Sequence, residues 1–485
     1  MPALGIPVEQ LNNPGLESPY SIVNSTNSYG IVSGSFPSGW LDNSRYAGTH
    51  TANVYVQEAS GTVSGSAFRA TASVQSGYGS GANVELFQTF YAAAQRPYTA
   101  RVWLKSSANM NVTFGIRMAA APYTQRAAAN CSVTPAWTPF TLSLTPSTNE
   151  TLALEVKHST PSVTLWIDEA SCQVQDGQRG WFVSPAGSDT NSGSLATPFQ
   201  TLARACTNLL AGDTLYLRGG TYRETLQLPR SGTHENPITV CAYIAEPVTL
   251  SGCDVLAGPW SPTSNGIYAA SAGWTLGSGY NQVFVDGTMQ QEARHPDHGS
   301  GDLLSPSTSP LSVSSNHTVT CSAFDGKGDL TGARFFASVG SSWAWQNALV
   351  ASNKTGTLFL NPSTASTWWW PNYANKSSDT GRGFLYGLPC LLDADGEWLV
   401  QTNGAAPHTL HLRMAGGADP SSHLVEMKRR TWCVDLNGQN FITVSNMAFR
   451  AGAVRLNGEG LVLDSCDARH LSHYLVYSSG GSANG

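Results

Sequence analysis

Two matching segments near the carboxyl end of the chain decide the fold: Val434-Asp435-Leu436-Asn437-Gly438 and, 20 residues later, Val454-Arg455-Leu456-Asn457-Gly458. The match continues downstream, where residues 441–444 align with residues 461–464. A period near 20 residues, with one set of apolar side chains directed inward, is typical of a β-solenoid in which each repeat forms one coil. In such a stack Asn437 lies over Asn457, and we expect their side-chain amides to hydrogen-bond as a ladder.

The segment that begins at Trp181 has the pattern expected for the first coils of the same stack. Trp181-Phe182-Val183-Ser184-Pro185 and Thr214-Leu215-Tyr216-Leu217-Arg218 are predicted strands. Between them, Thr197 and Pro198 are typical of the N-cap and the first residue of a helix. Apolar residues then recur with helical spacing on one face, formed by Phe199, Leu202, Cys206 and Leu209. A helix with one apolar face can cover the open apolar end of a coil stack.

These residues resemble the start of secreted right-handed parallel β-helix proteins of the pectate-lyase-like superfamily. The matching motifs are Gly212-Asp213-Thr214-Leu215-Tyr216, Gly219-Gly220-Thr221-Tyr222-Arg223-Glu224 and Asn236-Pro237-Ile238-Thr239-Val240. The resemblance implies that residues 181–485 form a right-handed parallel β-helix, with its start at residues 181–254 and further coils at residues 431–485. Because few coils fit in this length, we expect an incomplete carboxyl end, covered by a C-terminal fragment or by another copy of the chain.

Residues 255–430 do not repeat with the same period, and we expect a β-rich insertion there. Asp286-Gly287 is the predicted turn of a hairpin. The run Phe284-Val285-Asp286-Gly287, followed by Ala293-Arg294-His295-Pro296, resembles similar excursions in bacterial β-helix proteins. Long excursions on a rigid scaffold commonly build a ligand cleft. Trp368, Trp369 and Trp370 are three consecutive tryptophans. They could form a stacking surface for a sugar, anchor a protein interface or pack in a core.

Residues 1–176 consist of short alternating runs broken by Gly, Ser, Pro and Asn, which predicts a β-sandwich. Landmark motifs follow in the order Asn13-Pro14-Gly15-Leu16-Glu17, Trp40, Val102-Trp103-Leu104-Lys105 and Leu165-Trp166-Ile167-Asp168-Glu169. This order resembles carbohydrate-binding modules of the family 4/9/22 type, and it implies a jelly-roll sandwich that binds sugars. In that family the first Glu and the closing Asp often help to hold a structural calcium ion, so the resemblance implies Glu17 and Asp168 as ligands. Two solvated carboxylates are the alternative.

Sugar-binding sites of such modules place aromatic faces against pyranose rings. Tyr78 lies in the glycine-rich turn Ser76-Gly77-Tyr78-Gly79-Ser80, and we therefore expect it to be exposed and to contact the glycan. Trp103 lies in a strand between Val102 and Leu104, and we expect it to be buried in the core.

Two clusters contain the residue types that polysaccharide cleavage needs. A lyase requires a cation beside the uronate carboxylate, a base and an acid, whereas a hydrolase requires two carboxylates flanking the bond. The first candidate cluster is Arg294, His295, Asp297 and His298. The second is Asp464, Asp467, Arg469, His470 and His473, with Arg450 one coil above His470. The 20-residue register places Asp464 and Asp467 where the preceding coil is apolar, which indicates either a coil corner or a site. Solvated turns are the alternative, and the lysine–arginine pair expected of family 6 lyases is not identifiable.

Composition excludes several classes of function. Charged residues make up 12% of the chain, against about 25% in ordinary soluble proteins, and the net charge is −6. A nucleic-acid-binding protein would show a basic face instead. No apolar stretch is long enough to predict a membrane-spanning helix. The low charge and many aromatic residues favour an extracellular or cell-surface all-β protein. Cys131–Cys172 and Cys241–Cys253 are the first candidate disulfides.

Two functions of different classes fit this sequence. The first is a secreted carbohydrate-active protein, in which the sandwich binds a polysaccharide and the β-helix cleaves it as a lyase or a glycoside hydrolase. The second is a non-catalytic extracellular surface or structural protein that binds glycans or assembles through its β-helix. Unsaturated sugar ends in the products would identify a lyase, reducing ends alone would identify a hydrolase, and neither would favour the binding protein.

Overall fold

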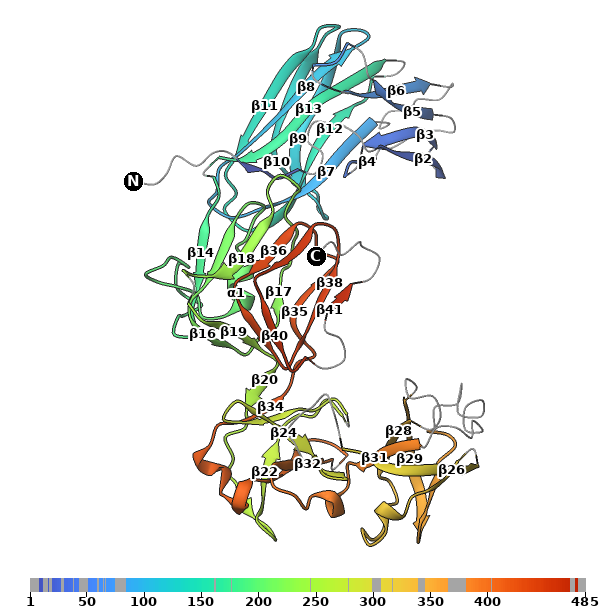
Figure 1. Ribbon diagram of the computed structural model, residues 1–485. Coiled ribbons are helices and arrows are strands. Elements are labelled where there is room, and N and C mark those ends of the chain that lie inside the picture. Colours follow the sequence, from blue (N-terminus) through green and yellow to red (C-terminus); the bar gives the residue numbers. More distant parts are fainter. Residues whose placement is uncertain are drawn as a thin grey trace.

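The computed structural model is almost entirely β and has three parts that follow one another in space (Figure 1). The sandwich lies at one end, the β-helix in the middle and the insertion at the other end. The expected all-β fold, with a jelly-roll sandwich, a parallel β-helix, a helix at its start and a β-rich insertion, is confirmed. The structure describes residues 8–11, 16, 20–27, 30–37, 39–42, 51–58, 61–63, 65, 67–74, 84–160, 163–175, 177–244, 246–277, 279–298, 307–315, 317–338, 345–364, 381–402, 404–471 and 476–478.

Two sheets form the sandwich, and their apolar faces enclose a core that contains Tyr98, Phe114 and Ile167. The larger sheet has the order β11 (Thr138–Leu144), β8 (Tyr98–Ser106), β13 (Thr164–Val174), β6 (Ala67–Val74), β5 (Thr51–Glu58), β3 (Gly30–Pro37) and β2 (Tyr20–Asn27), with β1 (Val8–Glu9) beside β13. The smaller sheet has the order β10 (Gln125–Val133), β9 (Met110–Met118), β12 (Glu150–His158), β7 (Val84–Ala92) and β4 (Leu41–Asp42).

Strand β8 divides its residues between the two faces of the larger sheet. Ala100, Val102 and Leu104 are buried in the core, so the residues between them point out of the sandwich. Trp103 is one of these and is half-buried on the outer face. The expectation of a core position for Trp103 is therefore wrong, because neighbouring residues of a strand point to opposite sides.

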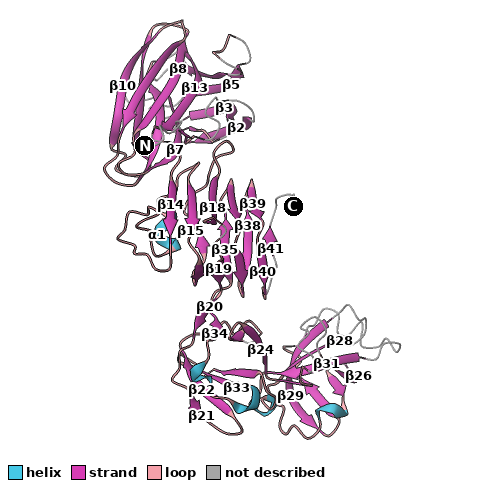
Figure 2. Ribbon diagram, turned by 60° about the vertical axis from the view of Figure 1, so that its left-hand side comes forward, coloured by secondary structure: helices cyan, strands magenta, loops and turns pink. Residues whose placement is uncertain are grey.

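The β-helix is built from three sheets in which every described strand pairing is parallel, and Figure 2 shows its strands stacked side by side. The first sheet contains β14 (Gly180–Val183), β15 (Thr214–Leu217), β18 (Ile238–Ala242), β36 (Ile442–Ser445) and β39 (Leu461–Asp464). The second contains β16 (Gly220–Tyr222), β19 (Val248–Ser251), β37 (Ala448–Arg450) and β40 (Asp467–Arg469). The third contains β17 (Leu226–Gln227), β35 (Trp432–Asn437), β38 (Ala453–Asn457) and β41 (Val476–Ser478).

The asparagine ladder is confirmed in the third sheet, where β35 pairs with β38 at the expected 20-residue offset. Asn437 lies opposite Asn457, and Nδ2 of Asn457 donates to Oδ1 of Asn437 at 2.7 Å. Strand β18 pairs directly with β36, and β19 with β37, although the insertion separates them in the sequence. The coils before and after the insertion therefore form one continuous stack.

The register changes by one residue immediately after the ladder. Asp464 lies opposite Ser445, and Asp467 lies opposite Ala448, so these strands pair at an offset of 19 residues. The reason is the turn that follows each asparagine, which spans residues 438–441 in one coil and only residues 458–460 in the next. The prediction that Asp464 and Asp467 replace inward-facing apolar residues is therefore wrong, and both side chains are exposed.

The helix at the start of the β-helix is shorter than predicted. It begins after Thr201, which is the N-cap and accepts from the N–H of Arg204, and it forms α1 (Leu202–Cys206). The predicted N-cap Thr197 is wrong, because Phe199 is extended and bridges Val183. The Asp189 carboxylate fixes the turn between Phe199 and α1, because it accepts hydrogen bonds from the N–H groups of residues 200 and 201 at 2.9 Å. The buried face of α1 packs on the first coils.

The insertion leaves the β-helix through β20 (Cys253–Val255) and returns through β34 (Val425–Lys428), which pair antiparallel. Its first sheet has the order β20, β34, β23 (Val283–Val285), β24 (Thr288–Glu292), β32 (Glu397–Gln401), β33 (His408–Arg413), β22 (Ile267–Ala272) and β21 (Ser261–Pro262). Its second has the order β25 (Arg294–His295), β31 (Gly381–Tyr386), β26 (Ser309–Ser315), β27 (Thr318–Thr320), β30 (Thr357–Leu360), β29 (Trp345–Lys354) and β28 (Arg334–Ser338). The described part of the insertion also contains four short 3-10 turns, η1 (Ser322–Phe324), η2 (Pro389–Leu391), η3 (Ala415–Gly417) and η4 (Pro420–Ser422).

The predicted hairpin turn at Asp286-Gly287 is confirmed between β23 and β24. Both turn residues have positive φ angles, 48° and 83°, which is the conformation that a two-residue hairpin turn of this kind requires.

Buried ion pairs fix both junctions between the three parts. At the first junction, Nη1 of Arg96 lies 3.2 Å from Oδ2 of Asp213, and both side chains are 1% exposed. At the second, the buried Glu426 of β34 contacts Arg223 at 2.6 Å and Arg450 at 2.9 Å. Arg223 and Arg450 belong to the β-helix, so this carboxylate holds the base of the insertion against it.

All nine cysteines are free thiols, which contradicts both candidate disulfides. Cys131 and Cys172 are buried in strands of opposite sheets of the sandwich, β10 and β13. Cys241 lies at an outward-facing position of β18, whereas Cys253 is buried in β20.

Candidate functional site

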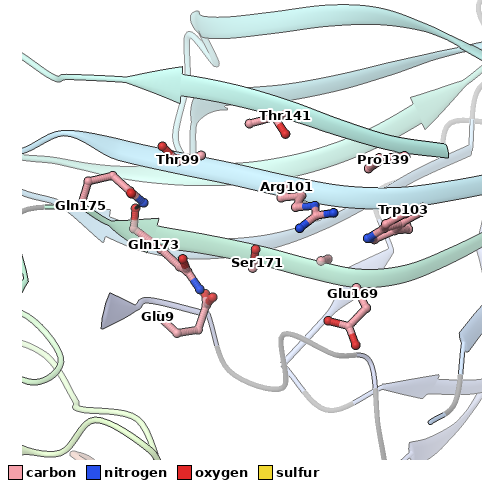
Figure 3. A pocket seen from close by; sticks show the side chains of 11 residues that line it. Glu9, Thr99, Arg101, Trp103, Pro139, Thr141, Glu169, Ser171, Gln173 and Gln175 are labelled. Atoms are coloured by element: carbon pink, nitrogen blue, oxygen red, sulfur yellow. Dashed lines mark hydrogen bonds between the residues drawn. The ribbon is translucent and has the colours of Figure 1, made fainter. Parts of the chain in front are cut away.

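A pocket of about 600 Å³ lies on the outer face of the larger sheet of the sandwich (Figure 3). Strands β1, β8, β11 and β13 bring its side chains together, although the first and last of them are far apart in the sequence. The pocket is lined by Glu9, Thr99, Arg101, Trp103, Pro139, Thr141, Glu169, Ala170, Ser171, Gln173 and Gln175.

Strand geometry explains why these polar residues converge. Thr99, Arg101 and Trp103 occupy successive outward positions of β8. In β13 the register shifts between Asp168 and Ser171, and Glu169 has a φ angle of 47°. This bulge turns Glu169 to the outer face next to Trp103, as Figure 3 shows.

The chemistry of the pocket suits a hydroxylated ligand. Trp103 offers an aromatic face, and the guanidinium carbon of Arg101 lies 5.2 Å from the centre of its ring. Gln173 and Gln175 provide amides that both donate and accept hydrogen bonds, and Thr99 adds a hydroxyl. A stacking surface surrounded by several short polar groups is the arrangement expected for a site that orients a small polar ring.

Glu9 is the group of the pocket with the most perturbed ionisation. Burial raises the pKa of Glu9 to about 7, although backbone N–H groups stabilise its carboxylate. Oε1 accepts from the N–H of Cys172 at 2.9 Å, of Leu11 at 2.9 Å and of Gln10 at 3.0 Å. Near neutral pH, Glu9 is therefore divided between a form that accepts and a form that donates a hydrogen bond.

Aromatic and cationic side chains continue along the same outer face beyond the pocket. Nζ of Lys105 lies 4.7 Å from the ring centre of Trp166 and 5.0 Å from that of Trp137. Nε1 of Trp137 donates to the carbonyl of Gly61 at 2.8 Å, which fixes its ring. The face therefore offers further stacking surfaces for a ligand longer than one ring.

The outer face of the smaller sheet carries a buried ionic cluster instead. Arg117 donates to Glu155 at 2.7 Å and to Glu85 at 2.8 Å, and all three side chains are buried. The guanidinium lies 5.3 Å from the ring centres of both Phe87 and Tyr123. Burial raises the pKa of Glu155, and Glu85 adds to this effect while Arg117 opposes it. These polar atoms bind one another, whereas the ring of Tyr123 beside them is exposed.

Several predicted binding residues lie outside the described residues: Glu17, Tyr78, Trp368, Trp369 and Trp370. Asp168 is fully buried, and its carboxylate accepts from the N–H of Val63 at 2.7 Å and of Glu169 at 2.8 Å. A carboxylate held by backbone donors retains lone pairs that suit a hard cation. Calcium binding by Asp168 and Glu17 stays a prediction, and no cluster of three or more His, Cys, Asp or Glu side chains suited to a metal occurs within the described ranges.

The second predicted catalytic cluster lies at the end of the β-helix. Asp467 forms an ion pair with Arg469 at 2.8 Å, and both side chains are more than half exposed. His470 is half-buried, with its ring 5.4 Å from that of Phe284 in the insertion. Burial lowers the pKa of His470, and Arg450 and Arg469 lower it further. Asp464 is exposed and accepts from its neighbour Ser465 at 3.1 Å.

Arg294 and His295 lie elsewhere, in β25 of the insertion, which pairs with β31. Figure 1 shows β31 in the insertion and β40 in the β-helix, so the two predicted clusters do not meet. Arg294 is buried, and its guanidinium donates to the carbonyls of Pro296 and Ser307. Burial lowers the pKa of Arg294 to about 10. Nε2 of His295 lies 3.0 Å from the carbonyl oxygen of Ala323. Both side chains of β25 are therefore bound to backbone carbonyls of neighbouring segments.

Sequence reasoning missed the residues of the sandwich pocket, above all Glu9, Arg101 and Gln173. The alternation of polar and apolar residues along β8 and β13 could have predicted that Arg101, Trp103 and Gln173 point outward. Glu9 had no such signal, since only the pairing of β1 with β13 brings it to the pocket.

Residues 181–293 match the family described as Pel9A-like, right handed beta helix region. Two curated relatives match part of the chain: the uncharacterized protein YwoF of Bacillus subtilis (strain 168), 49% identical over 71 residues, and pectate lyase PEL9 of Emericella nidulans, 40% identical over 80 residues. These matches cover 15% and 16% of this chain. The chain spans only 15% and 20% of the two relatives' own lengths.

Solved structures similar to the chain include one described as a glycoside hydrolase, with 19% identity, a TM-score of 0.45 and coverage of 56% of this chain and 50% of that one. Another is the CBM22-1 xylan-binding domain from Paenibacillus barcinonensis Xyn10C, with 12% identity, a TM-score of 0.22 and coverage of 28% and 86%. The matched residues 181–293 are thus similar to a right-handed β-helix region, which agrees with the parallel pairing of β14, β15 and β18. Within the described residues, no helix is long and apolar enough to span a membrane.

Proposed function

We propose that this chain is an extracellular carbohydrate-active protein that binds a polysaccharide on the outer face of its sandwich and cleaves it as a lyase on the β-helix. The observation that carries the binding part is the polar pocket around Trp103, which continues into the surface of Trp137 and Trp166. The similarity of the β-helix to the Pel9A-like family and to pectate lyase PEL9 supports the lyase part.

The side chains proposed for cleavage lie on the second sheet of the β-helix. Arg450 and Arg469 lie opposite each other in successive coils. Each already pairs with a carboxylate, Glu426 and Asp467 respectively, so a uronate carboxylate would share these cations with the protein's own acids. His470 follows directly and is neutral at pH 7 because its pKa is lowered, so it can accept a proton. Asp464 and Asp467 are exposed, and we assign them no more than contacts with the bound chain.

Binding is tested with two matched aromatic variants, by affinity electrophoresis of the whole chain in gels that contain pectin, xylan or neutral glucans. We expect Trp103→Ala to weaken binding about 10-fold, which corresponds to about 1.4 kcal/mol for one lost stacking contact. We expect Tyr123→Ala, on the outer face of the smaller sheet, to bind like the wild type. Loss of binding in Tyr123→Ala but not in Trp103→Ala would instead place the glycan-binding site on the smaller sheet.

Cleavage is tested by following unsaturated products by ultraviolet absorbance with uronate-containing substrates. We expect His470→Gln to lose this activity, whereas His234→Gln keeps it, because the side chain of His234 is 81% exposed and its ring lies beside Phe441 rather than in the second sheet. New reducing ends without ultraviolet absorbance would instead identify the protein as a glycoside hydrolase. Binding without any product would leave the non-catalytic glycan-binding protein as the function.

A further inference from the structure

A second pocket, of about 250 Å³, lies in the insertion where the chain passes from its first sheet to its second. Glu292 ends β24 in the first sheet, and Arg294 begins β25 in the second. Strands β28 and β31 contribute Phe336, Phe384 and Tyr386. Figure 1 shows β24 and β31 at the opposite end of the molecule from β8, so this pocket is separate from the sandwich site.

Three aromatic side chains form one wall of this pocket. In β31 the buried Leu385 faces the core of the insertion, so Phe384 and Tyr386 point to the other side, where they are half-buried. Phe336 lies directly opposite Phe384 on β28, with the ring centres 5.5 Å apart, and Tyr386 follows at 5.9 Å from Phe384. Half-buried aromatic side chains that face away from the core leave apolar surface available to a ligand.

Glu292 is the acidic group of the pocket, and among the described residues its carboxylate has no hydrogen-bond partner. Burial raises the pKa of Glu292 to about 7, and the nearby Arg334 only partly opposes this effect. In the described part of the chain, Glu292 takes part in no hydrogen bond and no ion pair. A half-buried carboxyl group without a hydrogen-bond partner is energetically unfavourable. A ligand that brings a hydroxyl to the carboxylate would offset this cost.

The charges around the pocket restrict the class of ligand. The guanidinium carbon of Arg294 lies 3.8 Å from the ring centre of Phe384, so one aromatic face already holds a cation. A cationic ligand would be attracted by Glu292 but repelled by Arg294, and an anionic ligand the reverse, so the two charges together favour neither sign. A neutral ring with hydroxyl groups meets neither obstacle. The volume of about 250 Å³ is below the ~300–1,000 Å³ of sites for drug-sized ligands, so it suits a single ring.

We propose that the pocket at Glu292 binds one neutral pyranose unit, which stacks on Phe336 and Phe384 while one of its hydroxyls donates to the Glu292 carboxylate. This inference rests on the proposed function, because the unit belongs to the polysaccharide that the sandwich binds. The insertion then provides a second point of contact. Two linked contacts raise the apparent affinity for a polymer well above that for a single sugar.

The test uses the whole chain and saturation-transfer NMR with glucose, galactose and xylose as probes. We expect the wild type to show saturation transfer to at least one of these sugars. Glu292→Leu removes the acceptor, and Phe336→Ala removes half of the stacking surface, so each is expected to weaken binding about 10-fold or more. Glu292→Gln restores an acceptor and is expected to recover most of the binding. Glu235→Gln is the control, because that side chain is 83% exposed and outside the pocket.

Each outcome separates this inference from the proposed function. A monosaccharide signal that persists in Trp103→Ala, and disappears in Glu292→Leu and Phe336→Ala, supports the pocket, whether or not the sandwich binds a polymer. A signal that survives both pocket variants, or that is absent from the wild type, overturns it even if polymer binding through Trp103 is observed. Circular dichroism melting curves identify any variant that fails to fold. In that case Glu292→Gln decides, because it preserves the shape of the side chain. A changed preference among the three sugars supports the contact with Glu292, and the same preference as the wild type contradicts it.

Discussion

The buried pair between Arg96 and Asp213 allows the junction of the sandwich and the β-helix to be tested quantitatively. Asp213 is fully buried, and besides Arg96 it accepts from the N–H of Arg179 at 2.9 Å and of Leu210 at 3.0 Å and from Nε1 of Trp181 at 3.1 Å. Burial raises the pKa of Asp213, and Arg96 is the main group that opposes this effect. Arg96 also donates to the carbonyl of Gly177.

We expect Arg96→Met to destabilise the protein by about 3 kcal/mol. Removing one partner of a buried ion pair costs about 3–5 kcal/mol, and the three other donors to Asp213 favour the lower end. Methionine keeps most of the apolar stem of arginine, so little of this loss comes from packing. For units of about 150–250 residues, a loss of this size lowers the melting temperature by roughly 6–12 °C.

Differential scanning calorimetry of the whole chain measures this effect, and the double variant Arg96→Met/Asp213→Asn is the control. Because the double variant leaves no unpaired charge, we expect it to melt at least about 4 °C above Arg96→Met. Arg96→Met should also recover stability as the pH falls from 8 to 5, because its uncompensated carboxyl can then bind a proton. A loss of less than about 1 kcal/mol, or a double variant less stable than the single one, would refute this reasoning.

Three further predictions concern the fold, the pH dependence and calcium. Gly452→Ala should cost about 1–3 kcal/mol in urea unfolding, because its Cβ would lie 2.7 Å from Sγ of Cys433, whereas Gly273→Ala, with nothing within 4 Å, should cost less than about 0.5 kcal/mol. The folded-state pKa of Glu9 is raised from 4.5 to about 7, so the contribution of Glu9 to stability falls as the pH rises between these values. From pH 5 to pH 8, Glu9→Gln should therefore gain about 1–3 kcal/mol of stability relative to the wild type, measured from melting temperatures. A stability difference that stays the same over this pH range would contradict this. If calcium binds at Asp168, EDTA should lower the melting temperature of the wild type, and Asp168→Asn should remove the response to added Ca²⁺.

The sequence contains the periodic and local signals that predict the scaffold. Inward-facing apolar residues recur from coil to coil, and Asn437 and Asn457 occupy equivalent positions, so the stack and its amide ladder are visible without coordinates. The hairpin at Asp286-Gly287 is predictable for a similar reason, since its turn type depends on two adjacent residues. Such features require only neighbouring residues or a constant spacing.

The tertiary structure decided the features that depend on turn length and on contacts between distant segments. One residue fewer in the turn before Leu461 moves Asp464 from the expected inward position to an exposed one. The pairing of β1 with β13 carries Glu9 to the pocket beside Trp103, and the meeting of two sheets places Glu292 against the aromatic wall. The sequence determined by itself the stack of coils and the hairpin, because these follow from a constant spacing or from adjacent residues. Only the folded chain determined which polar side chains share a pocket, because that depends on where strands from distant parts of the sequence pack together.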